Sequence, residues 1–280
     1  MPKIYQSGVK GNPLLRTLIT AFTWFIALLF FFPVFWITLI SFRAEKDAGT
    51  FPPTIVAPFT WDNWSSVFQK GAGQYLMNST IASVLSTVLV LILAYPAAYA
   101  LSIKPIHRSK DVLSFFLSTK FLPPIAALLP LYLIFKNLHI LDNIWALGVL
   151  YITMNLPLSV WMLRSFLKEI PSELVEAAEL DGASLTQILL RVLAPVSLPG
   201  IAATALISFI FTWNEFLMAI NLTGFHAATA PVYLVSFITA EGLFFAHLAA
   251  VSIVVSLPVV IAGWVAQDKL VRGLSLGAVK

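Results

Sequence analysis

Cysteine is absent from this 280-residue sequence. Its absence excludes disulfide bonds and any metal ion or iron–sulfur cluster that is held by thiolates, and it removes the usual indicator of the redox compartment. The sequence also lacks clustered carboxylates and the H-E-x-x-H pattern of zinc enzymes, and its four histidines are scattered. No G-x-x-x-x-G-K-[ST] phosphate loop is present either, so the chain cannot cradle ATP phosphates by that means.

Charge is scarce as well. Only 11% of the residues are charged, 59% are hydrophobic, and the mean hydropathy is +0.89. A soluble domain carries roughly 25% charged residues, so this chain cannot cover itself with a polar surface and is predicted to be an integral membrane protein. In a soluble protein the net charge of +4 would suggest nucleic acid. Here we attribute it to loops on one side of a membrane and expect no nucleic-acid partner.

Long apolar runs are what the sequence does have. A spanning helix needs about 20 mostly apolar residues, and six runs meet this requirement: 17–42, 75–101, 112–135, 144–166, 199–222 and 245–268. The first run is too long for a cleavable signal peptide and lacks a small-residue cleavage site, so we expect a signal anchor. A shorter run, 231–238, is expected to lie on the membrane or dip into it. The fold class predicted is all-α, with six transmembrane helices.

Lysine and arginine predict the orientation of these spans. Twelve of these basic residues precede the first span, follow the last, or lie in the second and fourth connections, whereas four lie on the opposite side and Lys120 falls within a span. The positive-inside rule therefore places both termini in the cytoplasm. We expect a cytoplasmic segment over residues 1–16, a six-helix domain over 17–268 with a cytoplasmic loop at 168–198, and a cytoplasmic tail over 269–280.

The long connection 43–74 on the opposite side is rich in aromatic residues and proline. For individual tryptophans, such as Trp61 and Trp64, we favour the aromatic belt that lines membrane interfaces. Together with the connection 225–243, this loop could alternatively form an outward surface that receives a partner.

The cytoplasmic loop holds the densest charge in the chain. Ser172 is predicted to cap a helix, with acidic residues near the positive end of the helix dipole. Spacing of three places acidic side chains on one face: Glu173, Glu176 and Glu179. Small or apolar residues form another face: Leu174, Ala177 and Ala178. On spacing alone, an ordinary solvated helical hairpin explains the loop equally well.

A second helix is predicted directly after the first. Gly182 is expected to end the first helix, because glycine accepts the left-handed conformation found at helix ends. Ser184 and Gln187 have the spacing of a capping box. An amphipathic stripe follows: Leu185, Ile188, Leu189 and Val192. Pro195 and Pro199 are expected to end this helix at the membrane.

Several motifs together resemble those of permease subunits of ABC importers. The loop motif consists of Glu176, Ala177, Ala178, Asp181, Gly182 and Ala183, followed at a distance by Pro195. It is similar to the carbohydrate group, in particular to the second permease subunit of maltose-type importers, although Ala194 stands where leucine is commoner. Three further segments carry the resemblance: Asn78-Ser79 with the span after it, Trp213-Asn214-Glu215-Phe216, and the tail Gly277-Ala278-Val279-Lys280.

This resemblance implies a type I importer permease in a bacterial cytoplasmic (inner) membrane, surrounded by lipid. Such a subunit pairs with a homologous permease, sits on two ATPase subunits and receives solute from an extracytoplasmic binding protein. It is no enzyme and binds no cofactor, since ATP and Mg²⁺ are bound by the ATPases. The loop motif and the tail residues 277–280 are implied to contact those ATPases.

Polar residues within the spans are candidates for the solute pathway, because a charge in hydrocarbon costs roughly 2.5–3.5 kcal/mol on insertion scales. Lys120 precedes two prolines, which favours a broken, water-lined helix. Glu215 is either a pathway residue or a structural or gating residue, and a Lys120–Glu215 ion pair would need no solute at all. Three weaker candidates complete the set: Asn155, Trp161 and Asn214.

Two other classes of function remain as alternatives. An ion-coupled secondary transporter or a channel could use Glu215 for coupling, but it would leave the Glu-Ala-Ala loop unexplained. A membrane-embedded enzyme would need a catalytic cluster that the sequence does not show. The solute itself is predicted only as a sugar, a sugar derivative or a polyol.

Overall fold

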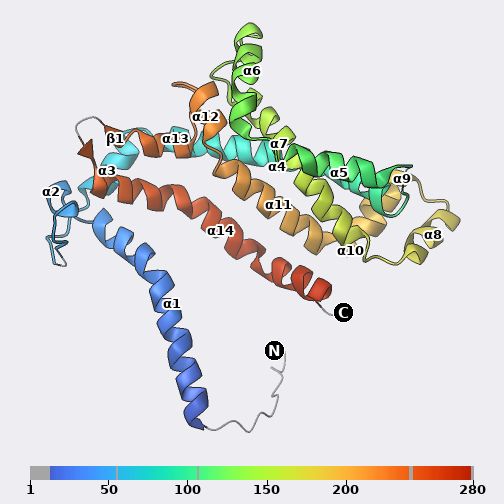
Figure 1. Ribbon diagram of the computed structural model, residues 1–280, viewed down its shortest axis with the longest axis horizontal. Coiled ribbons are helices and arrows are strands. Elements are labelled where there is room, and N and C mark those ends of the chain that lie inside the picture. Colours follow the sequence, from blue (N-terminus) through green and yellow to red (C-terminus); the bar gives the residue numbers. More distant parts are fainter. Residues whose placement is uncertain (1–12, 55, 106, 240–241, 279–280) are drawn as a thin grey trace. The chain divides into compact units, whose positions relative to one another are not determined.

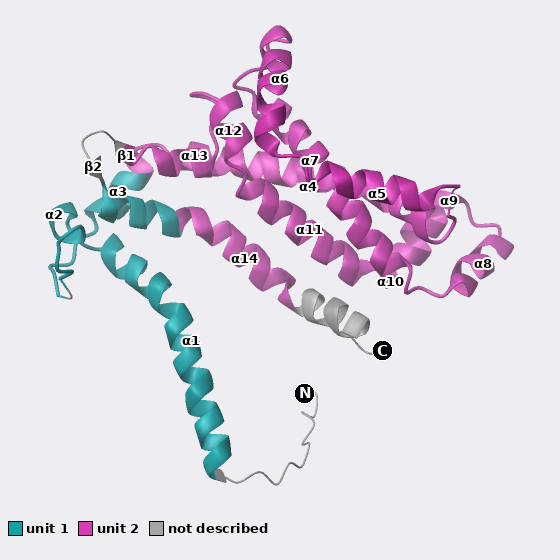
Figure 2. Cartoon of the chain, in the orientation of Figure 1, with its two compact units in different colours: residues 1–67, 244–253 teal, residues 68–243, 254–280 magenta. Residues whose placement is uncertain are grey.

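The computed structural model describes residues 13–54, 56–105, 107–239 and 242–278. Nearly all of this part of the chain is helical (Figure 1). The chain divides into two compact units (Figure 2). Unit 1 comprises residues 1–67 and 244–253, and unit 2 comprises residues 68–243 and 254–280. Helix α14, Phe245–Ala278, contributes to both.

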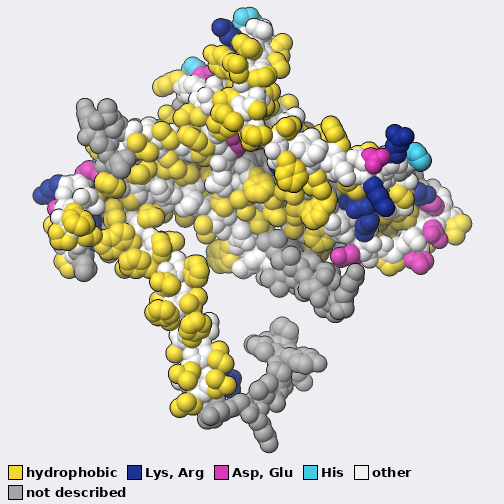
Figure 3. All heavy atoms as spheres, in the orientation of Figure 1, with side chains coloured by type: hydrophobic (Ala, Val, Ile, Leu, Met, Phe, Trp, Pro, Cys, Tyr) yellow, Lys and Arg dark blue, Asp and Glu magenta, His cyan; other side chains and the backbone are white. Residues whose placement is uncertain are grey.

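Unit 1 is dominated by α1, Pro13–Ser41, the first predicted span. None of the residues in its most apolar window is buried within the chain, and hydrophobic side chains cover it from end to end (Figure 3). A helix that is apolar all round is normally enclosed by other helices or by lipid. Helix α1 therefore requires a cover, and the described residues of unit 1 do not supply one.

The connection after α1 is folded around its aromatic residues. It contains α2, Glu45–Ala48, and α3, Asp62–Gln69. The ring of Phe42 stacks on Phe59 at 4.6 Å and on Trp64 at 5.3 Å between centroids. Arg43, only 4% exposed, lies over the Trp36 ring and donates a hydrogen bond to the Thr54 carbonyl. These contacts give the loop a small core of its own.

A carboxylate from this loop caps α14. The Glu45 carboxylate accepts hydrogen bonds from the backbone N–H groups of Ala246 and His247, at 3.0 and 3.2 Å, and its Oε2 lies 2.8 Å from Nδ1 of His247. These N–H groups belong to the first turn of the helix, where intrahelical acceptors are missing. The loop is therefore tied to the start of the last span.

Unit 2 is built on three packed helices: α4, Ala72–Ser102; α7, Ile144–Leu167; and α11, Leu198–Trp213. Helices α4 and α7 approach closely at Gly148, where an added Cβ would lie 2.8 Å from the Leu85 side chain. Two apolar clusters can be described in its core. One surrounds Leu147 and Tyr151, and the other surrounds Tyr95 and Leu163.

Two of the six predicted spans are broken. Residues 112–135, predicted as one helix, form α5, Ser109–Thr119, and α6, Pro124–Asn137, which meet at 85°. Proline explains this correction, because Pro123 and Pro124 cannot donate the N–H bonds that would continue α5. Residues 199–222 were likewise predicted as one span, but α11 ends at Trp213 and α12 covers only Leu217–Leu222.

The segment that enters α11 is bent as well. It comprises α9, Leu185–Gln187; the π-helix η1, Ile188–Leu193; and α10, Ala194–Val196, and it meets α11 at 86°. The described residues thus contain four helices that are long and apolar enough to span a membrane, or six spans if each bent pair counts as one. On that count the predicted number of spans is confirmed.

Short elements complete unit 2. Helix α8 covers Ser172–Leu180. The apolar run predicted to be too short to cross the membrane forms α13, Ala230–Val235. An antiparallel pair follows, β1, Ile238–Thr239, and β2, Gly242–Leu243. This pair of two-residue strands does not change the fold class, and the all-α expectation is confirmed.

Candidate functional site

The start of α8 differs from the prediction. Pro171 occupies the N-cap position in an extended conformation, and Ser172 is already the first helical residue. No side chain accepts a capping hydrogen bond there. Pro171 can fill this position because a cap residue needs extended rather than helical dihedral angles.

The faces of α8 also require a correction. Val175 and Ala178 are buried, whereas Leu174 is 38% exposed and Ala177 is exposed. Val175 and Ala178 join the apolar cluster that includes Ile188 and Leu193 of η1. The buried face is thus set by i, i+3 packing on η1. The side chains that point away from the core are Glu173, Glu176, Ala177, Glu179 and Leu180.

The end of α8 confirms the role predicted for Gly182, whose φ is +77°. The Ala183 N–H donates to the Ala178 carbonyl, and the Gly182 N–H donates to the Glu179 carbonyl, both at 3.0 Å. This pair of hydrogen bonds is a Schellman motif, which requires a left-handed residue after the helix. Asp181, which stands between the last residue of α8 and Gly182, is exposed.

The second helix of the loop begins as predicted. The Ser184 N–H donates to Gln187 Oε1 at 2.7 Å, and the Gln187 N–H donates to Ser184 Oγ at 3.4 Å, which completes the capping box. The expectation that Pro195 ends this helix is wrong, because the helix continues to Val196. The preceding π-helical turns widen the backbone, so the proline ring is accommodated without stopping the helix.

Two contacts connect the loop and α7 to the end of α4. Lys104 Nζ lies 2.7 Å from Glu179 Oε1, with both side chains partly exposed. The hydrogen bond with Glu179 raises the pKa of the Lys104 ammonium. Arg164 of α7 donates from Nε to the carbonyl of Leu101 at 2.9 Å, and so satisfies a carbonyl in the last turn of α4.

Glu215 lies in the break between α11 and α12. Its carboxylate accepts hydrogen bonds from the Tyr151 hydroxyl at 2.8 Å, from the Met218 N–H at 2.8 Å and from the Ala219 N–H at 3.1 Å. These two N–H groups belong to the first turn of α12. Glu215 therefore caps α12 and links it to α7, which is the structural alternative left open by the sequence.

Lys120 lies in the other break, directly after α5. Its ammonium donates to the Met154 carbonyl of α7 at 2.7 Å, and the side chain is exposed. The two ion pairs found in the described part of the chain do not include it. The hypothesis of a Lys120–Glu215 ion pair is therefore wrong for this conformation.

The remaining pathway candidates divide between the interior and the surface. Asn155 is 5% exposed, and its amide donates to the Tyr151 carbonyl and to Thr212 Oγ1, both at 3.0 Å. Trp161 is 44% exposed, and Asn214 is exposed with its amide donating to the Ile210 carbonyl. Asn155 and Glu215 thus both contact Tyr151, Asn155 at the backbone carbonyl and Glu215 at the hydroxyl.

Sequence reasoning missed Tyr151 and Asp142. Tyr151 stands four residues before Asn155, a helical spacing that could have indicated a shared face. The Asp142 carboxylate accepts the N–H groups of Gly224, His226 and Ala227 at 2.8–3.0 Å. Burial opposes its ionisation, but these three donors outweigh that effect and lower the pKa of Asp142.

The Asn78-Ser79 pair supports the same loop. The Asn78 amide donates to the carbonyls of His226 and Ala228, and Ser79 Oγ accepts the Ala230 N–H at 2.8 Å. In the sequence this pair was only a feature of family resemblance. In the structure it holds the connection 223–230 against α4.

The tail is described in part. Gly277 and Ala278 lie at the end of α14. The other two tail residues for which an ATPase contact was predicted, Val279 and Lys280, lie outside the described residues.

Comparison with known proteins gives consistent results. Residues 91–271 match the family described as binding-protein-dependent transport system inner membrane component. A probable ABC transporter permease protein, y4oR of Sinorhizobium fredii, is 35% identical over 95% of this chain and 96% of its own length. The trehalose transport system permease protein SugB of Mycobacterium tuberculosis is 33% identical over 89% of this chain and 92% of its own. The sulfoquinovosyl glycerol transport system permease protein SmoH of Agrobacterium fabrum is 29% identical over 89% and 88%.

The fold also has a solved counterpart. One chain in the crystal structure of a bacterial ABC transporter involved in import of the acidic polysaccharide alginate superposes with a TM-score of 0.74. The match covers 96% of this chain and 100% of that chain, at 22% identity. At this identity the similarity concerns the fold alone.

Proposed function

The chain belongs to the family of binding-protein-dependent transport system inner membrane components, and from this membership we propose that it is the transmembrane subunit of an ATP-driven importer for a sugar, a sugar derivative or a polyol. Relatives named for trehalose and for sulfoquinovosyl glycerol support the carbohydrate class. The subunit itself performs transport, and separate ATPase subunits bind ATP and Mg²⁺ and hydrolyse the ATP.

The complete importer contains a second, homologous permease, two ATPase subunits and an extracytoplasmic solute-binding protein, in the inner membrane of a bacterium. Helix α1 supports the need for further membrane partners, because it is apolar all round and has no buried residue in its most apolar window. The ion-coupled alternative relied on Glu215. That carboxylate is engaged by three donors within the chain, which argues against a coupling role.

The loop 168–198 is the element that couples this subunit to an ATPase. The observation that carries this proposal is the division of α8 into a buried face and an exposed, acidic one. Val175 and Ala178 hold the helix on η1, while Glu176, Ala177 and Leu180 face outward, Leu180 with 90% exposure. A rigid helix that presents a small residue and acidic side chains fits a cleft on a partner that carries basic groups.

Two glycine variants test the loop under matched strain. Gly182 and Gly71 both have positive φ, +77° and +86°, and an added Cβ at either would meet no atom within 4 Å. Gly182→Ala and Gly71→Ala therefore add a similar backbone strain, about 1–2 kcal/mol, at opposite ends of unit 2. We expect Gly182→Ala to weaken co-purification with the ATPase and to lower ATP-dependent uptake in vesicles, and Gly71→Ala to leave both near wild type.

Glu176→Lys is the complementary test, because it reverses the charge on the exposed face without disturbing Val175 or Ala178. The expected result is an inserted subunit that no longer retains its ATPase. Wild-type assembly and uptake in both Gly182→Ala and Glu176→Lys would reduce the loop to a solvated hairpin.

The tail has a second contact with the ATPases, through Gly277, Ala278, Val279 and Lys280. Deletion of residues 274–280 should then reduce uptake or its regulation while membrane insertion is retained. Unchanged uptake together with unchanged ATPase recovery would dismiss this contact and leave the tail as a basic segment near anionic lipid.

A further inference from the structure

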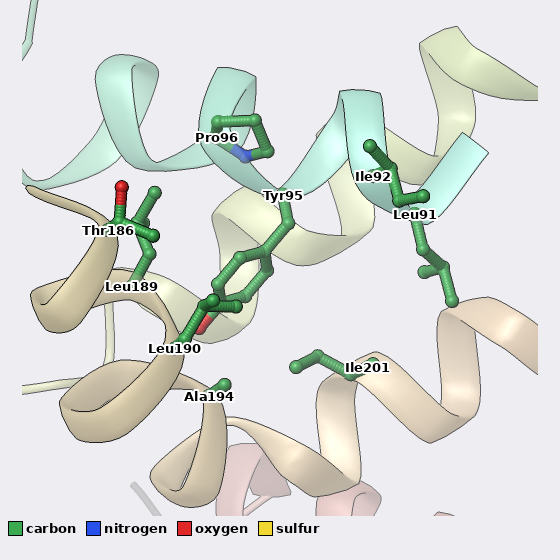
Figure 4. A pocket seen from close by; sticks show the side chains of 9 residues that line it. All are labelled: Leu91, Ile92, Tyr95, Pro96, Thr186, Leu189, Leu190, Ala194 and Ile201. Carbon is green, nitrogen blue, oxygen red and sulfur yellow. The ribbon is translucent and has the colours of Figure 1, made fainter. Parts of the chain in front are cut away.

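A crevice opens in unit 2 between α4 and the bent segment that follows α8 (Figure 4). Its volume is about 350 Å³, within the range of about 300–1,000 Å³ that is usual for ligand pockets. Helix α4 contributes Leu91, Ile92 and Tyr95, and the bent segment contributes Leu189, Leu190 and Ala194. The side chains from the two elements face one another across the space (Figure 4).

The lining is suited to hydrocarbon and not to a sugar. The hydroxyl of Tyr95 is engaged by Ser197 Oγ at 2.8 Å. The only other side-chain hydroxyl of the lining belongs to Thr186, on the exposed helix α9. A carbohydrate in this crevice would lose its hydrogen bonds to water without replacement, at a cost for each hydroxyl. The crevice is therefore unsuited to a carbohydrate.

Its position corresponds to the hydrocarbon of the cytoplasmic leaflet, in the orientation that the proposed function implies. Pro96 and Ile92 precede Leu101, the last residue of the predicted span, by 5 and 9 residues, or about 8 and 14 Å along a helix. Half of the hydrocarbon core is about 15 Å thick. Ile92 and Leu190, at the mouth, are 61% and 63% exposed.

The mouth is continuous with a surface of hydrocarbon side chains. Val84, Val88 and Ile92 follow one another at intervals of four along α4, and all are about half exposed or more. A helix face of this kind on a membrane span faces lipid tails. The crevice is thus an opening in the lipid-facing surface of unit 2.

We propose that this crevice binds one acyl chain of a phospholipid from the cytoplasmic leaflet. Arg191, exposed and adjacent to Leu190 in η1, provides a cation for an anionic headgroup. The connection between α4 and α5 adds Arg108, and the first turn of α5 adds Lys110. One wall of the crevice is a span and the other is η1, on which α8 packs. The bound chain therefore stabilises the coupling loop against α4.

The walls and the volume suit a single acyl chain. Apart from the hydroxyls of Tyr95 and Thr186 the lining is hydrocarbon, and a flexible polymethylene chain can follow a crevice of about 350 Å³ between the two walls.

The test uses the complete transporter in liposomes that contain a phosphatidylglycerol with a diazirine in its acyl chain. After irradiation, lipid adducts are mapped by peptide mass spectrometry. We expect adducts on two segments, residues 91–96 of α4 and 186–194 of the bent segment. Ala194→Trp and Ile92→Trp fill the crevice from opposite walls and should abolish the adducts on the facing segment. Val84→Trp, on the same lipid-facing stripe but outside the crevice, is the matched control and should retain them.

The headgroup is tested separately. Arg191→Gln should lower labelling by the anionic probe about fivefold, the effect of one basic residue near a membrane surface, and should not affect a phosphatidylcholine probe with the same chain. Adducts that persist in both filling variants, or an absence of adducts on both segments in the wild-type transporter, would overturn the proposal. Labelling does not depend on sugar uptake, so a transporter with no carbohydrate activity would contradict the proposed function and leave this proposal standing.

Discussion

Each of the two broken spans of unit 2 has one charged residue at its break, and the two residues differ in how many hydrogen bonds the protein makes to them. In the α11–α12 break, Glu215 is engaged by three donors: one hydroxyl and two backbone N–H groups. In the α5–α6 break, Lys120 donates one hydrogen bond to a carbonyl, and its side chain is exposed. An ammonium has three protons to donate. Lys120 thus retains protons that it can donate to another group, whereas the carboxylate of Glu215 already accepts three hydrogen bonds from the protein.

The breaks also differ in their origin. Pro123 and Pro124 stop α5 because they lack the N–H groups of a continuing helix. No proline lies between Trp213 and Leu217. There the Glu215 side chain takes the N–H groups of Met218 and Ala219 and so competes with continuation of the helix. The α5–α6 break is thus caused by the prolines and not by Lys120, whereas Glu215 is among the causes of the α11–α12 break.

The largest effect is expected for Glu215→Ala. The variant leaves two helix N–H groups and the Tyr151 hydroxyl without their acceptor, and hydrogen bonds to charged groups contribute about 1.5–3 kcal/mol each. We expect a loss of at least about 3 kcal/mol in the free energy of unfolding, measured as thermal or denaturant midpoints of the purified subunit. Tyr151→Phe, which removes one of these bonds, should lose about 1.5–3 kcal/mol. Equal stability of Glu215→Ala and wild type would refute the capping role.

The next prediction is the charge swap, Lys120→Glu combined with Glu215→Lys. If the two residues formed an ion pair, the double variant would recover the activity lost by each single variant. Because each residue has different partners, we expect no recovery, and stability no better than in Glu215→Lys alone. A double-mutant cycle on uptake and on unfolding midpoints measures this coupling. Substantial recovery would show that a conformation with the pair exists.

The sequence predicted that Lys120 and Glu215 lie within spans, but not which groups they contact. Apolar run length located the spans, and turn chemistry located Gly182 and the capping box, since both signals are local. The partners of Glu215 were not predictable, because Tyr151 lies on another helix and is brought near by packing. The prediction of the buried face of α8 failed for the same reason. Val175 rather than Leu174 is buried because η1 lies beneath it.

Lys120→Met should affect uptake more than stability. If Lys120 contacts the solute, the loss of this charged donor lowers uptake about tenfold or more, while the unfolding free energy should change by no more than about 1 kcal/mol. Lys120→Arg retains the charge and is the control for a purely electrostatic role. Wild-type uptake in Lys120→Met, with ATPase assembly intact, would remove Lys120 from the pathway.

Asp142 is a third charge that can be compared with these two. It lies outside the spans and, like Glu215, accepts three hydrogen bonds from the protein. Its pKa in the folded protein lies below the ordinary 3.8. A carboxyl group whose pKa is lower in the folded state stabilises the fold at pH values above its pKa in the unfolded state. This contribution is lost as the pH falls through the pKa of the folded state. We expect protection of the Gly224 and Ala227 amides from hydrogen exchange to decrease below about pH 4. Asp142→Asn should lack this pH dependence, and an equal dependence in both would contradict the assignment.

The smallest effect is expected at the pair Lys104–Glu179, which is close at 2.7 Å but exposed on both sides. Water and salt screen such a pair, and its two long side chains lose conformational freedom when they are held together. Glu179→Gln should therefore leave the unfolding midpoint unchanged within error, in contrast to Glu215→Ala. Any effect on uptake should be slight and should vanish at high ionic strength, since the Debye length falls to about 3 Å at 1 M salt. A loss of stability comparable to that of Glu215→Ala would mean that burial and the number of partners do not set the contribution of a charge in this protein. The contrast between the two broken spans would then need another cause.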